Sequence, residues 1–124
     1  MPRTGSSIVI IKWRDIPAQV NAQFGRERYQ VILPARFQRA IDRAKRKANI
    51  YTAEEDVAQW VRETLPLEGT MEDAAHAVAA RIESEFPRER LGRIAYAGGF
   101  ERDVEQYDVP AEELAALEEL DEES

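Results

Sequence analysis

The sequence predicts an α+β domain, in which three or four helices pack on one face of a three-stranded antiparallel sheet, followed by an acidic C-terminal tail. Two observations favour this fold. Apolar residues alternate with a period of two before residue 34 and recur at every third or fourth position after it, which are the periods of strands and helices. The connections between the predicted strands are short, as is typical of antiparallel neighbours.

Three strands are predicted before residue 34. Residues 8–13 form a nearly continuous apolar run, typical of a strand buried on both faces, and the segment ending at Pro17 interrupts it. Residues 18–24 alternate apolar and amide side chains, which predicts a strand with one solvated face. Residues 29–33 alternate in the same way after a turn at Gly25, so the three strands should form a meander.

The clearest predicted helix covers residues 34–48. It begins at Pro34, whose missing N–H costs nothing at that position, and its apolar residues form one stripe. Asn49 is placed to end the helix in a left-handed conformation, with Ile50 folded back onto the last turn.

Two capping boxes mark the helices that follow. Thr52 with Glu55 predicts a helix that continues to residue 65, and Thr70 with Asp73 predicts a longer helix that ends before Pro87. A proline follows each of these two segments, which favours an end at that point.

Trp60 falls in the apolar stripe of the helix predicted up to residue 65, so we expect it to be more buried than Trp13. A short fourth helix over residues 88–97 should end at the pair Gly98-Gly99. All the long apolar stripes lie before these glycines, which predicts a folded domain over residues 1–100.

The charge of the chain is divided unevenly along its length. Residues 1–50 carry eleven Lys and Arg against three Asp and Glu, whereas residues 51–124 carry six against twenty-one. Residues 101–124 alone hold eleven acidic side chains and one basic side chain. Two interpretations of this tail stay open: a solvated, partly disordered extension, or a docking peptide with Leu114 and Leu117 as its anchors.

Composition excludes several classes of protein. The chain has no cysteine, so it forms neither disulfides nor thiolate metal sites. The longest apolar run is residues 8–11, too short for a signal peptide or a membrane span, which predicts a cytoplasmic protein with no membrane contact. His76 is the only histidine and should lie on the surface, so we expect no metal site and no cofactor.

Residues 12–15 form the first candidate site, at the end of the first predicted strand. Trp13 and Arg14 could form a stacking or cation–π platform, with Asp15 orienting Arg14 and Lys12 adding charge. The alternative interpretation is structural: Trp13 caps the core, and Asp15 holds the turn by accepting backbone N–H groups.

Five cations form the second candidate site, on the helix predicted over residues 34–48. At about 100° per residue they share an arc of about 100° beside the apolar stripe. They are Arg36, Arg39, Arg43, Arg46 and Lys47. Three interpretations stay open: a solvated face paired with acids, a surface for an anionic protein segment, and a nucleic-acid surface. The net charge of −7 disfavours nucleic acid, and the anionic segment could be the tail of this chain.

The segments I-K-W-R-D-I-P-A-Q-V at residues 11–20 and R-F-Q-R-A-I-D at residues 36–42 resemble the small bacterial "virulence factor" domain family. Trp60 matches the tryptophan typical of the family, and R-L at residues 90–91 with Gly98-Gly99 matches its closing element. The resemblance covers roughly residues 7–100. It implies a scaffold-like accessory role, linked to virulence or to folate- and corrinoid-dependent methyl-transfer enzymes. Family members are less basic at residues 45–47 and end soon after the glycines.

The sequence favours a non-catalytic accessory or adaptor protein with a protein partner. No nucleophile–base pair and no phosphate-binding glycine loop is present, and only Asp15, Asp42 and His76 are candidates for acid–base chemistry. Two alternatives stay open. One is a small-ligand protein or enzyme subunit that uses Lys12, Arg14 and Asp15, and the other is a nucleic-acid binder that uses the five cations. The sequence leaves the oligomeric state open.

Overall fold

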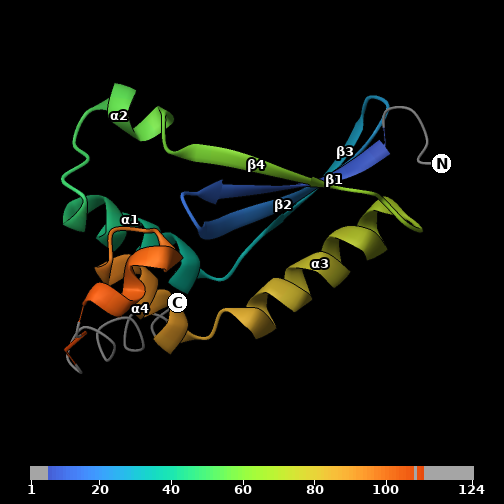
Figure 1. Cartoon of the computed structure of the whole chain (residues 1–124). Helices are drawn as coiled ribbons and strands as arrows, with labels where there is room; N and C mark the ends of the chain where they lie inside the picture. Colours follow the sequence, from blue (N-terminus) through green and yellow to red (C-terminus); the bar gives the residue numbers. More distant parts are fainter. Residues whose placement is uncertain (1–5, 108, 111–124) are drawn as a thin grey trace.

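The computed structural model describes residues 6–107, 109 and 110, which form a four-stranded antiparallel sheet with the longer helices on one side (Figure 1). The strand order is β3-β2-β1-β4. The strands are β1 (Ser6–Trp13), β2 (Ile16–Phe24), β3 (Glu27–Ile32) and β4 (Trp60–Leu65). The helices are α1 (Ala35–Lys47), α2 (Ala53–Val57), α3 (Met71–Glu85), α4 (Arg88–Tyr96) and the 3₁₀ helix η1 (Glu101–Gln106).

The α+β class and the β1-β2-β3 meander agree with the sequence prediction, but the sheet has a fourth strand. The predicted helix up to residue 65 is wrong: Glu55 N–H donates to Thr52 Oγ1 as the capping box requires, yet α2 ends at Val57. Residues 60–65 instead pair antiparallel with β1. The second edge of β1 offers backbone partners, and the aromatic and β-branched residues of β4 suit a strand.

Helices α1, α3 and α4 form where the sequence predicts them, whereas η1 was not predicted and lies in residues that the sequence assigned to the acidic tail. Asn49 ends α1 with a φ of 59°, and Ile50 N–H donates to Lys45 O over 2.9 Å. Asp73 N–H donates to Thr70 Oγ1 over 3.1 Å at the start of α3. Gly98 and Gly99 end α4 with φ values of 84° and 106°.

The hydrophobic core lies between the helices and one face of the sheet. In Figure 1, α1, α3 and α4 lie below the strands. Helix α3 packs on β2 and β3, while α1 packs on α4 and β2. The fully buried side chains include Ile8 of β1, Val20 of β2 and Phe37 of α1.

We call the other face of the sheet the open face. Of the described helices only the short α2 approaches it, at the end where Asp56 accepts from the indole of Trp60 (Figure 1). The strand register places on it every second residue of each strand. Apart from the fully buried pair Trp13 and Ile16 beside the β1–β2 turn, its members are Ser7, Val9, Ile11, Gln19, Asn21, Gln23, Arg28, Gln30, Ile32, Trp60, Arg62 and Thr64.

Candidate functional site

The first candidate site, at the turn between β1 and β2, makes several hydrogen bonds to distant segments of the chain. Trp13 is fully buried, and its indole Nε1 donates to Asp56 Oδ1 over 2.9 Å. Asp15 N–H donates to Gly99 O over 2.9 Å, and Asp15 Oδ2 accepts from Glu101 N–H over 2.9 Å. The side chains of Trp13 and Asp15 therefore hold distant segments together. Trp13 is part of the core, as the structural interpretation expects, but the carboxylate of Asp15 accepts from the distant Glu101 N–H and not from its own turn.

Arg14 occupies a strained position in this turn. Its φ is 53°, a left-handed conformation that is uncommon for a residue with a side chain. Its guanidinium lies 5.0 Å from the Trp13 ring centroid and 4.6 Å from that of Phe100. Nε donates to Gln59 Oε1 over 2.9 Å, and Nη1 donates to Gly98 O over 2.8 Å. Burial lowers the pKa of Arg14, and the charge of nearby Arg102 lowers it further.

The end of α4 closes over this turn because Gly99 has no side chain. A Cβ at Gly99 would lie 2.8 Å from Cζ3 of Trp13 and 3.0 Å from Cδ of Arg14. No real Cβ makes a carbon contact that short, so the backbone approaches the indole only at a glycine. Trp13 and Gly99 therefore pack directly against each other, although they are far apart in the sequence.

The carboxylate of Asp56, in α2, connects four elements: α2, α1, β1 and β4. It pairs with Lys45 Nζ at 2.8 Å and accepts from the indoles of Trp13 and Trp60, over 2.9 and 3.3 Å. The hydrogen bond from Lys45 lowers the pKa of Asp56 most, and those from Trp60 and Trp13 lower it further against the opposing effect of burial. In the sequence, the contact between Asp56 and Trp60 could have been found from their spacing of four residues.

The burial of Trp60 differs from the sequence prediction. It is partly exposed, whereas Trp13 has 0% exposure, so the expected order of burial is wrong. Trp60 lies on β4, an edge strand, and pairs with Trp13 in the register. An edge strand has a neighbour on one side only, which leaves part of the ring in solvent.

The five cations of α1 differ in their surroundings. Arg36 is half-buried and donates to Phe86 O and Glu83 O at the end of α3. Arg39 and Arg43 are also half-buried, whereas Arg46 and Lys47 are exposed. Lys47 Nζ lies 4.2 Å from the Tyr96 ring centroid. Leu114 and Leu117, the anchors predicted in the tail, lie outside the described residues.

Two further predicted site residues take part in surface contacts. Lys12 Nζ pairs with Glu63 Oε1 at 3.1 Å across β1 and β4. His76 is exposed, as expected, and its Nε2 lies 2.8 Å from the Tyr29 hydroxyl oxygen. No group of three or more potential metal ligands occurs among the described residues.

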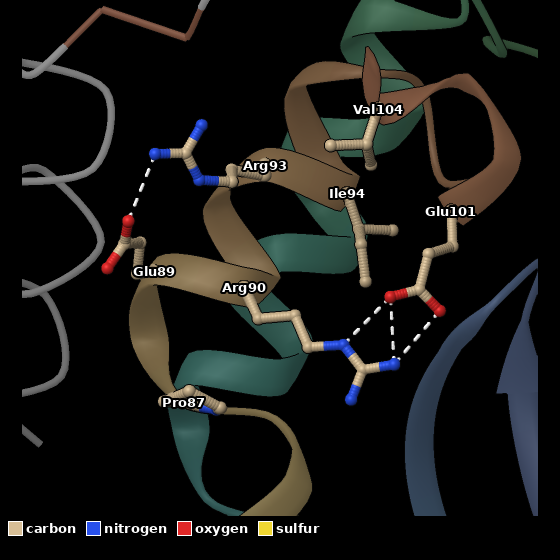
Figure 2. A pocket seen from close by; sticks show the side chains of 7 residues that line it. All are labelled: Pro87, Glu89, Arg90, Arg93, Ile94, Glu101 and Val104. Atoms are coloured by element: carbon tan, nitrogen blue, oxygen red, sulfur yellow. Dashed lines mark hydrogen bonds and ion pairs between the residues drawn. The ribbon is translucent and has the colours of Figure 1, made fainter.

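A hollow of about 320 Å³ lies between α4 and η1 (Figure 2). Ile94 and Val104 form its apolar part, and Arg90 and Glu101 point toward each other at its edge. Arg90 Nε donates to Glu101 Oε2 over 2.8 Å, while Arg93 pairs with Glu89 at 3.0 Å. The charged groups around this hollow are therefore paired with one another.

Two other hollows differ in chemistry. The first, of about 370 Å³, is polar and we call it the Arg14 pocket; it is lined by Arg14, Lys47, Ala48, Tyr96, Ala97, Gly98 and Tyr107. The second, of about 360 Å³, is mainly apolar and lies at one end of the open face. We call it the apolar groove; it is lined by Ile11, Ala18, Gln19, Ile32, Leu33, Gln38 and Trp60.

Comparison with known proteins gives one match. The family described as "Virulence factor" matches residues 11–95, which include the W-R-D turn and Trp60 and end before the glycine pair. No curated protein and no solved structure matches the chain. None of the described helices is long and apolar enough to cross a membrane. Since the match spans more than half of the sequence, the chain belongs to the virulence factor family.

Proposed function

We propose that this chain is a non-catalytic accessory protein that binds an anionic segment of a partner protein on the open face of its sheet. One observation carries the proposal: the strand residues of the open face include no acidic residue, although the chain has 24 of them. Asp56, which contacts this face through Trp60, is paired with Lys45. Arg28 and Arg62 are its only charged members. A surface that is positive in an otherwise acidic protein favours an acidic partner and steers its approach.

The apolar groove supplies an anchor point for such a segment. Ile32 is 64% exposed there, and Trp60 is partly exposed. Arg62 lies opposite Ile11 in the register, so it flanks the groove. An apolar side chain flanked by carboxylates fits this arrangement, because the groove buries the first and the arginine attracts the second.

The amide side chains of the open face support a polypeptide ligand. Gln19, Asn21, Gln23 and Gln30 offer donors and acceptors for the backbone of an added segment. Nucleic acid is the less favoured ligand, since single strands bind sheets by stacking bases on aromatic rings. Trp60, on an edge strand, is the one aromatic residue of this face that is accessible among the described residues, since Trp13 beside it is fully buried.

The contacts of the β1–β2 turn favour an accessory role over an enzymatic one. The side chains of Trp13, Arg14 and Asp15 all make internal hydrogen bonds. Arg46 and Lys47 remain candidates for a second anionic contact. The link to methyl-transfer enzymes that the family resemblance implies stays a prediction.

Selection of peptides from a random displayed library on the immobilised full chain tests the proposal. We expect the enriched peptides to combine acidic residues with a large apolar residue. Ile32→Asp should weaken their binding by about tenfold or more, because it places a charge in the groove. Tyr51→Asp is the matched control, since Tyr51 is 73% exposed and lies outside the sheet.

Two results would overturn the proposal. One is that the enriched peptides bind wild type and Ile32→Asp equally well. The other is that a mixed-sequence single-stranded oligonucleotide binds at physiological salt and is displaced by no selected peptide, which would favour the nucleic-acid alternative.

A further inference from the structure

The Arg14 pocket lies on the helix side of the β1–β2 turn, away from the open face, where the end of α1 approaches the end of α4. Two cations, Arg14 and Lys47, and two aromatic residues, Tyr96 and Tyr107, line it, and Lys47 Nζ lies 4.2 Å from the centroid of the Tyr96 ring. The two tyrosine rings contact each other edge to face, with centroids 6.0 Å apart. No carboxylate is among the residues that line this pocket.

Arg14 is a partly buried cation that makes no ion pair or hydrogen bond with a carboxylate among the described residues, although the more distant Asp103 attracts it. Both acceptors of its side-chain hydrogen bonds, Gln59 Oε1 and Gly98 O, are neutral. Cations removed from water are normally paired with an anion, because desolvation disfavours the charged form. That cost is visible here as the lowered pKa of Arg14.

A third cation increases the positive field at this position. Arg102 lies 4.3 Å from the centroid of the Phe100 ring, and Arg14 lies 4.6 Å from the same centroid. Its charge lowers the pKa of Arg14 more than Asp103 raises it. The pocket therefore combines Arg14 and Lys47 in its walls with Arg102 close by.

The guanidinium of Arg14 is held in place before any ligand arrives. The Trp13 and Phe100 rings and two hydrogen bonds fix its plane, and the two hydrogen bonds use Nε and Nη1 only. The Nη2 donors have no partner among the described residues. Left-handed backbone strain at a residue with a long side chain is typical of positions where the placement of that side chain matters.

We propose that the Arg14 pocket binds a small dianion, a phosphate group or a dicarboxylate, through Arg14 and Lys47 with a hydroxyl donor from Tyr107. Arginine binds such oxyanions through two parallel N–H groups, and lysine adds a point charge. The volume of about 370 Å³ leaves room for the body of a metabolite beside the anionic group. This ligand site is independent of the partner surface on the open face.

Calorimetric titration of the full chain with inorganic phosphate, and separately with succinate, tests the proposal at constant ionic strength set by chloride. We expect saturable binding of one of the two anions with a Kd of about 1 mM or tighter. Binding of phosphate alone would identify a phosphate ligand, and binding of succinate alone would identify a carboxylate ligand. Saturable binding of both anions would support the general dianion site.

Variants locate the binding without unfolding the protein. Lys47→Gln should weaken binding by about tenfold and Tyr107→Phe by about threefold, since both side chains are exposed and line the pocket. Arg62→Gln is the matched control: it removes the same charge from the open face and should leave the Kd unchanged. Arg14→Lys, which keeps the charge but loses the planar fork, should abolish saturation if the variant folds.

Two outcomes would overturn the inference. The first is that neither anion gives saturable heat or raises the melting temperature with increasing concentration. The second is that Arg62→Gln weakens binding as much as Lys47→Gln, which would show general attraction to the protein instead of a site. Either result leaves the peptide selection on the open face unaffected, so the two proposals fail separately.

Discussion

Trp13 and Trp60 lie opposite each other in β1 and β4 and donate to the same carboxylate, that of Asp56, yet their environments differ. Trp13 is fully buried, while Trp60 is partly exposed beside the apolar groove. The end of α4 covers the first ring through Gly99. The comparison shows that a covering element, and not the residue type or its pairing partner, decides which tryptophan is core and which is surface.

The largest expected effect comes from removing each indole. Trp13→Ala should lower the free energy of unfolding by about 3–5 kcal/mol, because it leaves a cavity between the sheet and Gly99. Trp60→Ala should cost about 2 kcal/mol, since water fills part of the space it leaves. Urea unfolding followed by circular dichroism measures both. Equal losses would contradict the difference in burial.

Gly99→Ala should have the next largest effect. It combines a left-handed φ with a Cβ 2.8 Å from Trp13, and we expect a loss of about 2–4 kcal/mol. Gly69→Ala is the matched control, because its φ of 78° is similar but nothing lies within 4 Å of the added Cβ. Its loss should be about 1 kcal/mol, from backbone strain alone. Thermal or urea unfolding would contradict the contact with Trp13 if both variants lost the same stability.

Asp56→Asn should cost about 1 kcal/mol at neutral pH, because it removes the charge that pairs with Lys45. The pKa of Asp56 is lowered in the folded state. The carboxylate therefore stabilises the fold fully above its ordinary pKa of about 3.9, and this contribution is lost as the pH falls through the lowered value.

The stability difference between wild type and Asp56→Asn should accordingly shrink between neutral pH and about pH 3. Urea midpoints at a series of pH values measure it, and Asp42→Asn on the exposed side of α1 serves as the control. A difference that grows toward low pH would contradict the sign of this pKa shift.

The smallest effect on stability is expected on the open face. Ile32→Asp should change the free energy of unfolding by less than about 0.5 kcal/mol, because the side chain is 64% exposed. It should nevertheless weaken peptide binding by about tenfold or more, whereas Trp13→Ala acts on stability. A large loss of stability would show that Ile32 belongs to the core.

Local signals in the sequence predicted α1, α3 and α4 well. The left-handed end at Asn49 and the box at Thr70 are decided by hydrogen bonds within a few residues, so the pattern is complete in the sequence. The meander was predictable for the same reason, because short connections join its strands.

Features that depend on distant partners could not be predicted in this way. Residues 60–65 form a strand because β1 has an unpaired edge, and that information lies about fifty residues away. Helical periodicity around Trp60 was compatible with both structures, and tertiary pairing decided between them. The contacts of Arg14 with Gln59 and Gly98 depend on equally distant segments.

The position of β1 between β2 and β4 has a consequence for the order of folding. Trp13 pairs with Ile16 across a tight turn on one side and with Trp60 on the other. Closing the longer loop costs more chain entropy, so the hairpin should form first and β4 should dock last. Until it docks, the apolar strand β1 presents a bare edge to the surrounding solution, as would happen in a nascent chain still emerging from the ribosome. Amide protons of β4 should consequently exchange with solvent faster than those of β2, because a strand that docks last in folding is also the first to detach in local unfolding.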